Sequence, residues 1–319
     1  MKKIKVAVIG VGHLGQHHAR IYAELANVRL AGVVDLDFAL AQNIAQLYQA
    51  KAYSNLFTLL EKEKIDAASI VVPTSVHFPV AQELLNAGIH CLVEKPITAS
   101  LNEATELVRL ANRKKLILQV GHVERFNVAV RELSKLLHQP RFIEAHRLSP
   151  FDPRVKDVGV VLDLMIHDLD IILAIVNSPI VALEAVGVAV LTNHEDIANA
   201  HIKFANGCIA NVTASRVSPD KMRKIRIFQP DTYFSLDYAL PELEVYQKVL
   251  QQGKPEIAYR KVNVEKQEPL RLELQSFLSC VRAGRKPVVS GEHGRDALEL
   301  ALEITRLIHI HGKTKNRKN

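Results

Sequence analysis

The sequence predicts a mixed chain: an α/β region with a doubly wound parallel sheet, then an α+β region with a large, mainly antiparallel open sheet. From residue 1 to about 122, short apolar runs alternate with helix-length amphipathic stretches, which is the pattern of β-α-β units. Later strand-like runs follow one another without helices between them, which favours antiparallel pairing. The chain of 319 residues has room for two domains, predicted at 1–122 and 123–319.

The first region is expected to contain alternating strands and helices. Strands are predicted at 4–9, 28–34, 67–72, 89–93 and 116–120, and helices at about 14–25, 37–48, 55–63, 76–87 and 100–113. Right-handed crossovers bring the carboxyl ends of parallel strands to one edge, where ligands bind. The loops 10–15, 73–77 and 94–96 should therefore meet at that edge.

The second region is expected to be rich in strands. They are predicted at 142–148, 181–190, 198–204, 208–214, 224–228, 233–237 and 243–249, with helices near 123–137, 160–176, 269–283 and 294–309. Asn206-Gly207 lies between two of the strands and is a strong hairpin signal. The polar and apolar alternation of these strands predicts a sheet with one face on the core.

The first strand runs into three glycines, Gly10, Gly12 and Gly15, spaced as G-x-G-x-x-G and followed by a helical pattern. Gly10 would permit the tight turn, Gly12 the approach of a pyrophosphate, and Gly15 close packing of helix on strand. The helix N-terminus would then face the phosphates. This context predicts a dinucleotide site, against the plainer alternative of a glycine turn between an ordinary strand and helix.

The second strand ends in Asp35, twenty residues beyond Gly15. An acidic side chain at this point can accept hydrogen bonds from both ribose hydroxyls and repels a 2′-phosphate. Neither Leu36 nor Asp37 supplies a cation for such a phosphate. The sequence therefore predicts NAD in preference to NADP.

Glu94-Lys95-Pro96 directly follows a buried strand of the predicted parallel sheet. A lysine at this edge points into the ligand crevice, where it could orient a substrate hydroxyl or stabilise a developing oxyanion. The local sequence is equally compatible with a solvated lysine before a proline that starts a loop.

The predicted helix over 160–176 is apolar on nearly all sides but carries one polar stripe. Asp163, His167 and Asp170 lie at i, i+4 and i+7. Burying such groups without partners is costly, so a stripe of this kind favours an active site. A carboxylate near His167 would raise its basicity and orient it as a general base for an alcohol. The alternative is a satisfied core histidine with Asp163 at a helix N-terminus.

Segment 121–127 joins the last parallel strand to the next helix at the same edge. Its Arg125 and Asn127 could bind phosphate or sugar hydroxyls, although capping and surface roles fit these residues equally.

The overall charge and cysteine content indicate a soluble cytoplasmic protein. Of the net charge of +7, four charges lie in a basic tail at 312–319, which leaves +3 for the rest. No DNA- or RNA-binding signature accompanies the charge, and no apolar run is long enough to span a membrane. Three isolated cysteines and the pair His309 and His311 give no recognisable metal site, so we expect no metal, nucleic acid or membrane partner.

The glycine loop, Asp35, the 73–77 loop, Glu94-Lys95-Pro96 and Asp163-x-x-x-His167 together resemble the glucose–fructose oxidoreductase/inositol dehydrogenase (Gfo/Idh/MocA) family. The resemblance implies an N-terminal Rossmann domain that binds NAD, and a C-terminal domain whose open sheet often forms dimers or tetramers. It also implies that His167 accepts the hydroxyl proton, Asp163 supports it and Lys95 orients the substrate oxygen.

The residues expected at the site form two groups. Cofactor contacts are expected from Gly10, Gly12, His13, Leu14, Gly15, Asp35, Pro73, Thr74, His77, Glu94 and Lys95. Substrate contacts are expected from Lys95, Arg125, Asn127, Asp163 and His167.

Segments 121–127, 194–200 and 211–216 resemble a branch of that family, the bacterial UDP-N-acetylglucosamine 3-dehydrogenases. This implies oxidation of the sugar C3 hydroxyl to a ketone, which an aminotransferase then uses to make a 2,3-diamino sugar for lipid A. A basic chain suits a doubly charged nucleotide sugar. A free sugar, an inositol or a UDP-uronic acid stays open as substrate, and so does a non-catalytic NAD-binding regulator.

Overall fold

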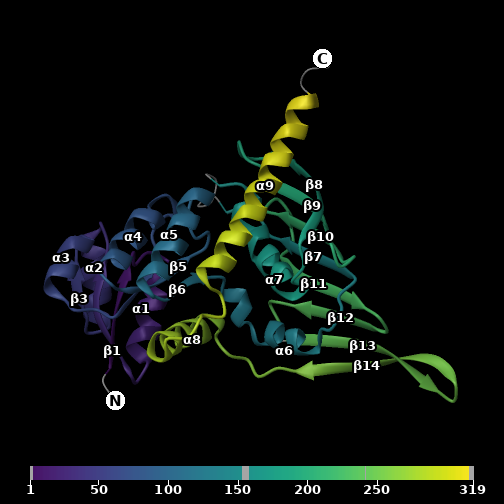
Figure 1. Ribbon diagram of the computed structural model, residues 1–319, viewed down its shortest axis with the longest axis horizontal. Coiled ribbons are helices and arrows are strands. Elements are labelled where there is room, and N and C mark those ends of the chain that lie inside the picture. The colour runs from purple at the N-terminus through teal and green to yellow at the C-terminus, as the bar shows by residue number, and fades with distance from the viewer. Residues whose placement is uncertain (1–2, 153–157, 241, 316–319) are drawn as a thin grey trace. The chain divides into compact units, whose positions relative to one another are not determined.

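The computed structural model describes residues 3–152, 158–240 and 242–315, and their helices and strands are drawn in Figure 1. The chain forms two compact units. One contains Met1–Val123 and Glu268–Asp296, and the other contains Glu124–Gln267 and Ala297–Asn319. This division differs from the sequence-based one, which placed everything after residue 122 in a single second domain.

The first unit is built on a parallel sheet of six strands in the order β3-β2-β1-β4-β5-β6, the strand order of a Rossmann fold. Its strands are β1 (Ile4–Ile9), β2 (Val28–Val34), β3 (Lys51–Tyr53), β4 (Ala67–Ile70), β5 (His90–Glu94) and β6 (Leu118–Gly121). The sequence did not predict β3, because three residues with only one fully buried side chain give no apolar run.

Helices lie on both faces of this sheet. They are α1 (Gly15–Glu24), α2 (Phe38–Leu47), α3 (Leu56–Lys62), α4 (His77–Asn86), α5 (Leu101–Lys114) and α8 (Pro269–Ala283), with a short 3₁₀ turn η1 (Thr74–Val76) before α4. Figure 1 shows α4 and α5 on one side of the sheet and α1 and α8 on the other. Local signals set their starts: Asp37 caps α2, and Ser100 with Glu103 forms a capping box at α5.

Helix α8 explains why the chain returns to the first unit. Its Leu274 and Phe277 are fully buried in the same apolar cluster as Ile21 and Tyr22 of α1. Removing several large apolar side chains from water stabilises this docking by about 1.5–3 kcal/mol for each side chain. The amphipathic pattern of 269–283 predicts the helix correctly but does not say which sheet it covers.

The second unit contains an eight-stranded sheet in the order β14-β13-β12-β11-β7-β10-β9-β8. Its strands are β7 (Phe142–Leu148), β8 (Ile180–Val188), β9 (Ile197–Phe204), β10 (Ile209–Ser215), β11 (Met222–Gln229), β12 (Thr232–Asp237), β13 (Glu242–Gln251) and β14 (Lys254–Asn263). Pairing is antiparallel except between β7 and β10. The predicted hairpin at Asn206-Gly207 joins β9 and β10, with Gly207 at a φ of +82°. Strand β14 was missed because its residues are almost all exposed.

Helices cover one face of this sheet. They are the turn η2 (Val123–Phe126) with α6 (Val128–Leu136), the π-helical turn η4 (Val161–Met165) with α7 (Ile166–Val176), and α9 (Gly291–Lys315), which enters this unit at Ala297. The helix predicted over 160–176 is one continuous helical segment that begins with a π-helical turn, whereas the helix predicted near 123–137 consists of two pieces, η2 and α6. Helix α9 also extends beyond the predicted 294–309, whereas residues 316–319 of the basic tail lie outside the described chain.

The opposite face of the sheet carries an aromatic ladder, which we define as Phe142, Phe228, Tyr233, Tyr246 and Tyr259. These rings come from five adjacent strands, and successive ring centroids are 5.7, 4.6, 5.2 and 5.1 Å apart. Tyr259 remains 54% exposed. A stacked apolar row on a sheet face that the described helices leave open is typical of a contact surface.

Candidate functional site

The glycine loop between β1 and α1 has the backbone that each glycine permits. Gly10 adopts a φ of +86°, and a Cβ there would lie 2.4 Å from the Val71 carbonyl oxygen. A Cβ at Gly15 would lie 2.0 Å from the Gly10 carbonyl oxygen, so both positions exclude larger residues. A Cβ at Gly12 would meet nothing within 4 Å, which leaves space for a ligand beside this backbone.

Asp35 lies beside the glycine loop at the end of β2. One carboxylate oxygen accepts a hydrogen bond from the Val11 amide at 2.9 Å, and the other accepts one from the Asp37 amide at 3.0 Å. These bonds fix the carboxylate where a ribose of a dinucleotide on the loop would lie. Next to the loop, the side chains of His13 and Leu14 are exposed. The loop and Asp35 therefore fit NAD.

His77 connects two of the loops that the sequence analysis placed at this edge. Its Nδ1 is 2.8 Å from the Pro96 carbonyl oxygen, and its Nε2 is 2.8 Å from the Val72 carbonyl oxygen. Burial lowers the pKa of His77, although both carbonyls favour the protonated ring. Both ring nitrogens already face protein atoms. His77 therefore connects the loop that contains Pro73 and Thr74 to the loop that contains Pro96.

Glu94 anchors the segment that carries Lys95. Its carboxylate is buried, lies 3.2 Å from Nε2 of His18 in α1, and accepts a hydrogen bond from the Lys95 amide at 3.3 Å. A Cβ at Gly121 would lie 2.7 Å from this carboxylate, so a larger residue there would displace it. Lys95 itself is half-buried and precedes a cis peptide bond to Pro96. The backbone of Lys95 is thus tied to α1 and to the neighbouring strand.

In the second unit, the predicted polar stripe separates into two parts. Asp163 in η4 and His167 in the first turn of α7 are half-buried, whereas Asp170 is buried. Arg125 lies 3.5 Å from the Asp170 carboxylate and 3.4 Å from its carbonyl oxygen. π-Helical turns occur frequently at functional sites, which makes the position of Asp163 notable. The stripe leaves Asp163 and His167 as its partly accessible members.

Asn127 has a structural role, the alternative that its sequence left open. Its Oδ1 accepts a hydrogen bond from the Ala129 amide at 3.1 Å and so caps α6. Its Nδ2 donates to the Tyr238 carbonyl oxygen at 3.3 Å, and the side chain is buried. Substrate binding by Arg125 and Asn127 stays a prediction, although both side chains already make contacts within the second unit.

Sequence reasoning missed a buried ion pair directly beside His167. Arg147 of β7 makes two bonds to Asp168, at 2.7 and 3.0 Å, and a third to Glu124 at 3.1 Å. Its guanidinium also lies 5.0 Å from the centre of the Tyr238 ring. This pair fixes α7 against the sheet. The signal was an arginine at a core-facing position of a strand, but its partner could not be read from the sequence.

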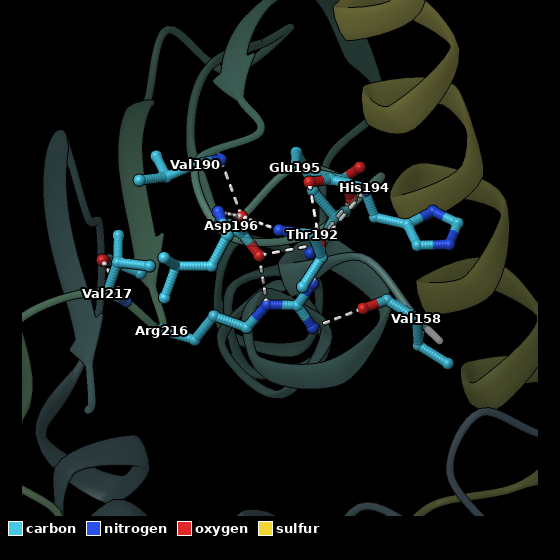
Figure 2. Close-up of polar contacts among 11 residues, drawn as sticks. Val158, Val190, Thr192, His194, Glu195, Asp196, Arg216 and Val217 are labelled. Atoms are coloured by element: carbon cyan, nitrogen blue, oxygen red, sulfur yellow. Dashed lines mark hydrogen bonds and ion pairs between the residues drawn. The ribbon is translucent and has the colours of Figure 1, made fainter. Parts of the chain in front are cut away.

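Sequence reasoning also missed a second buried pair, Asp196 with Arg216 (Figure 2). One Asp196 oxygen accepts hydrogen bonds from the amides of residues 190–192 at 2.6–2.9 Å, and the other lies 2.7 Å from Arg216 Nε. Burial would raise the pKa of Asp196, but these amides and Arg216 hold it well below its usual range. Arg216 also donates to the Val158 carbonyl oxygen, and the Val160 amide donates to the Glu195 carbonyl oxygen at 2.9 Å. The cluster therefore fixes the start of η4.

Comparison with known proteins assigns the chain to a family. Residues 4–122 match the model of the oxidoreductase family with an NAD-binding Rossmann fold, and residues 133–231 match the GFO/IDH/MocA C-terminal domain. UDP-N-acetylglucosamine 3-dehydrogenase of Acidithiobacillus ferrooxidans is 39% identical over 307 residues, which cover 95% of this chain and 97% of that protein. The chain belongs to the Gfo/Idh/MocA family.

A solved structure shares the whole architecture, and a second curated relative matches over a similar share of the chain. The solved structure of UDP-N-acetylglucosamine 3-dehydrogenase GnnA from Acidithiobacillus ferrooxidans superposes with a TM-score of 0.89 at 38% identity, covering 97% of this chain and 98% of that one. The scyllo-inositol 2-dehydrogenase (NAD(+)) of Bacillus subtilis is 27% identical over 95% of this chain and 93% of that protein. The predicted fold class, family and NAD cofactor are confirmed, and the chain is an NAD-dependent oxidoreductase. No helix in the described residues is long and apolar enough to cross a bilayer.

Proposed function

We propose that the protein oxidises the C3 hydroxyl of UDP-N-acetylglucosamine to the 3-keto sugar. The observation that carries this proposal is the 39% identity to a UDP-N-acetylglucosamine 3-dehydrogenase over nearly the full length of both chains. The inositol dehydrogenase that matches over the same share of the chain is only 27% identical. The net charge of +7 also suits a doubly negative substrate more than a neutral polyol.

The first unit would hold the cofactor. The glycine loop and the N-terminus of α1 receive the pyrophosphate, and Asp35 accepts the ribose hydroxyls. When bound, NAD accepts a hydride from the substrate carbon. Lys95, fixed at the end of β5 by Glu94, orients the substrate oxygen and stabilises its developing negative charge.

The second unit would supply the base. His167 accepts the hydroxyl proton, and Asp163, one helical turn earlier, supports the imidazolium that forms. The buried pair of Arg147 and Asp168 fixes the turn that bears His167, so the base needs little reorganisation. This division assigns hydride acceptance to one unit and proton acceptance to the other.

The proposal extends to the setting of the reaction. We place the enzyme in the cytoplasm as a homo-oligomer that uses the open sheet face, and we place an aminotransferase after it. A 3-keto sugar is the direct substrate for transamination to a 2,3-diamino sugar, the kind that lipid A contains. The aromatic ladder supports the oligomer, because isolated monomers rarely expose such a row.

A substrate panel tests the proposed function. UDP-sugars, free sugars and inositols are each incubated with the protein and NAD, and NADH formation is followed with a carbonyl trap present, because the ketone equilibrium is unfavourable. We expect turnover of UDP-N-acetylglucosamine above all other compounds. Reactions without protein and without trap are the controls. Turnover of an inositol but of no UDP-sugar would contradict the substrate and leave the dehydrogenase intact.

A further inference from the structure

Three arginines lie at the same end of three central strands of the eight-stranded sheet, on the face that the helices cover. Arg147 of β7 follows the buried Ile143 and Ala145 in alternation, and Arg223 of β11 stands in the same alternation before Ile225 and Ile227. Arg147 and Arg223 are direct cross-strand partners. Like charges placed opposite each other in this way destabilise a strand pair.

The third arginine, Arg216, follows the last residue of β10, whose partner in the parallel pairing with β7 is Leu148. The core-facing alternation of β10 through Val212 and Ala214 continues to Arg216, which is buried. The sheet therefore brings three guanidinium groups to its core face at one end of these strands, where apolar side chains are the usual occupants.

Two of these arginines have dedicated carboxylates and the third has none. Arg147 is bonded to Asp168 and Glu124, and Arg216 is bonded to Asp196 (Figure 2). Within 3–152, 158–240 and 242–315, no carboxylate lies within ion-pair distance of the half-buried Arg223. A partly desolvated cation without a partner is costly, so a partner from outside the chain is the simplest reason to keep it.

The surroundings of Arg223 place it near the proposed base. Burial and the positive charge of Arg147 lower the pKa of Arg223, and the carboxylates of Glu124, Asp168 and Asp163 partly oppose this shift. Glu124 and Asp168 are already bonded to Arg147. The placement itself follows from the strand pairing, since Arg223 is the cross-strand partner of Arg147, and Arg147 is bonded to Asp168, the residue that follows His167.

We propose that Arg223 is the anion-binding residue of the substrate site and holds the pyrophosphate of the nucleotide sugar. This assignment rests on the proposed function. The planar guanidinium fork matches two phosphate oxygens, and a phosphate would supply the direct ion pair that the described residues do not. A neutral sugar or inositol would supply no such pair, so Arg223 selects for a phosphorylated substrate.

The test compares Arg223→Gln and Arg223→Lys with Arg226→Gln. Arg226 is the matched control, because it lies on the same strand but on the opposite face, where its side chain is 47% exposed and 3.7 Å from Glu144. Binding of UDP and of inorganic pyrophosphate to the NADH-loaded protein is measured by isothermal titration. We expect Arg223→Gln to weaken UDP binding on the order of 10- to 100-fold. Arg223→Lys should weaken it less, and Arg226→Gln should have no effect.

The UDP affinities and melting temperatures of the two Arg223 variants can overturn the assignment. If Arg223→Gln binds UDP as tightly as the unaltered protein, the assignment is overturned. If Arg223→Gln melts at a much lower temperature than the unaltered protein, the UDP affinity of Arg223→Lys is the deciding measurement, because lysine keeps the charge but lacks the planar fork. Unchanged UDP affinity in Arg223→Lys would also overturn the assignment. Failure of the proposed function is seen separately in the substrate panel, where the unaltered protein would oxidise no UDP-sugar.

Discussion

His167 is the residue whose chemistry the proposed reaction needs most. Replacing it with alanine removes the proton acceptor, and general-base assistance is worth about 10²–10⁴-fold in rate. We expect His167→Ala to lower kcat for UDP-N-acetylglucosamine by that factor and to leave NADH affinity unchanged, because the glycine loop belongs to the other unit. Steady-state kinetics and NADH titration measure the two effects.

His201→Ala is the control for this variant. His201 is exposed on β9 of the same unit and bonds to Asn211 at 2.7 Å, away from the core-facing side of its strand. Its removal should leave kcat unchanged. Equal turnover by His167→Ala and the unaltered protein would refute the assignment of the base.

Individual residues differ in how much the sequence reveals about them. Gly10, Gly15 and Asp35 act within one short motif, so their spacing is sufficient to predict a dinucleotide site. The pair of Arg147 and Asp168 depends on a helix docking against a particular strand, and its members are 21 residues apart. No local pattern records such a contact, which is why the ion pair emerged only from the structure.

The turn η4 shows the same limit at the scale of an element. Its start is fixed by the Asp196 cluster, and Gly159 leaves room for Glu195, because a Cβ at residue 159 would lie 2.0 Å from the Glu195 carboxylate and would displace it. Apolar periodicity predicts a helix over 160–176 but does not distinguish π from α geometry, since this depends on contacts from residues 195–216. Elements with a clear apolar run, such as β1 and β2, or a clear alternation, such as β7, were predicted to the residue.

Asp196→Asn tests the cluster that fixes η4. The substitution keeps the shape of the side chain but removes the charge opposite buried Arg216, and breaking one half of a buried pair costs about 3–5 kcal/mol. We expect a clearly lower melting temperature and a lower kcat. Asp231→Asn is the control, because Asp231 is 63% exposed and its φ of 60° suits asparagine.

The pH dependence of this effect follows from the lowered pKa of Asp196. The ionised carboxylate stabilises the fold above the unfolded pKa of about 3.9, and this stabilisation is lost as the pH falls from there towards the folded pKa. The difference in melting temperature between Asp196→Asn and the unaltered protein should therefore be largest above about pH 4 and narrow below it. A difference that grows on acidification would refute this account.

At the scale of the whole molecule, the parallel sheet and the antiparallel sheet were both predictable, because period-2 and helix-length patterns persist over many residues. The return of 268–296 to the first unit was not predictable. An amphipathic pattern identifies the buried face of a helix but does not identify the element against which that face packs. In the second unit, the described helices leave one face of the sheet uncovered.

We expect the protein to be a dimer or tetramer at micromolar concentration, held by the aromatic ladder face. Light scattering on Tyr233→Lys with Tyr246→Lys should show a shift towards monomer, because two charges would be buried at the contact. Leu47→Lys, which adds a charge at a 69% exposed apolar position of α2, should leave the mass unchanged. A strictly monomeric unaltered protein would contradict this expectation.

The aromatic ladder also has an optical consequence. The chain contains no tryptophan, and three of its seven tyrosines belong to the ladder. Ultraviolet emission of the protein therefore comes mainly from tyrosine, and the ladder tyrosines respond to whatever covers the open sheet face. NADH fluoresces at longer wavelength and binds through the other unit. One unlabelled sample therefore gives two separate emission signals: NADH emission reports cofactor binding, and tyrosine emission reports contacts on the open sheet face.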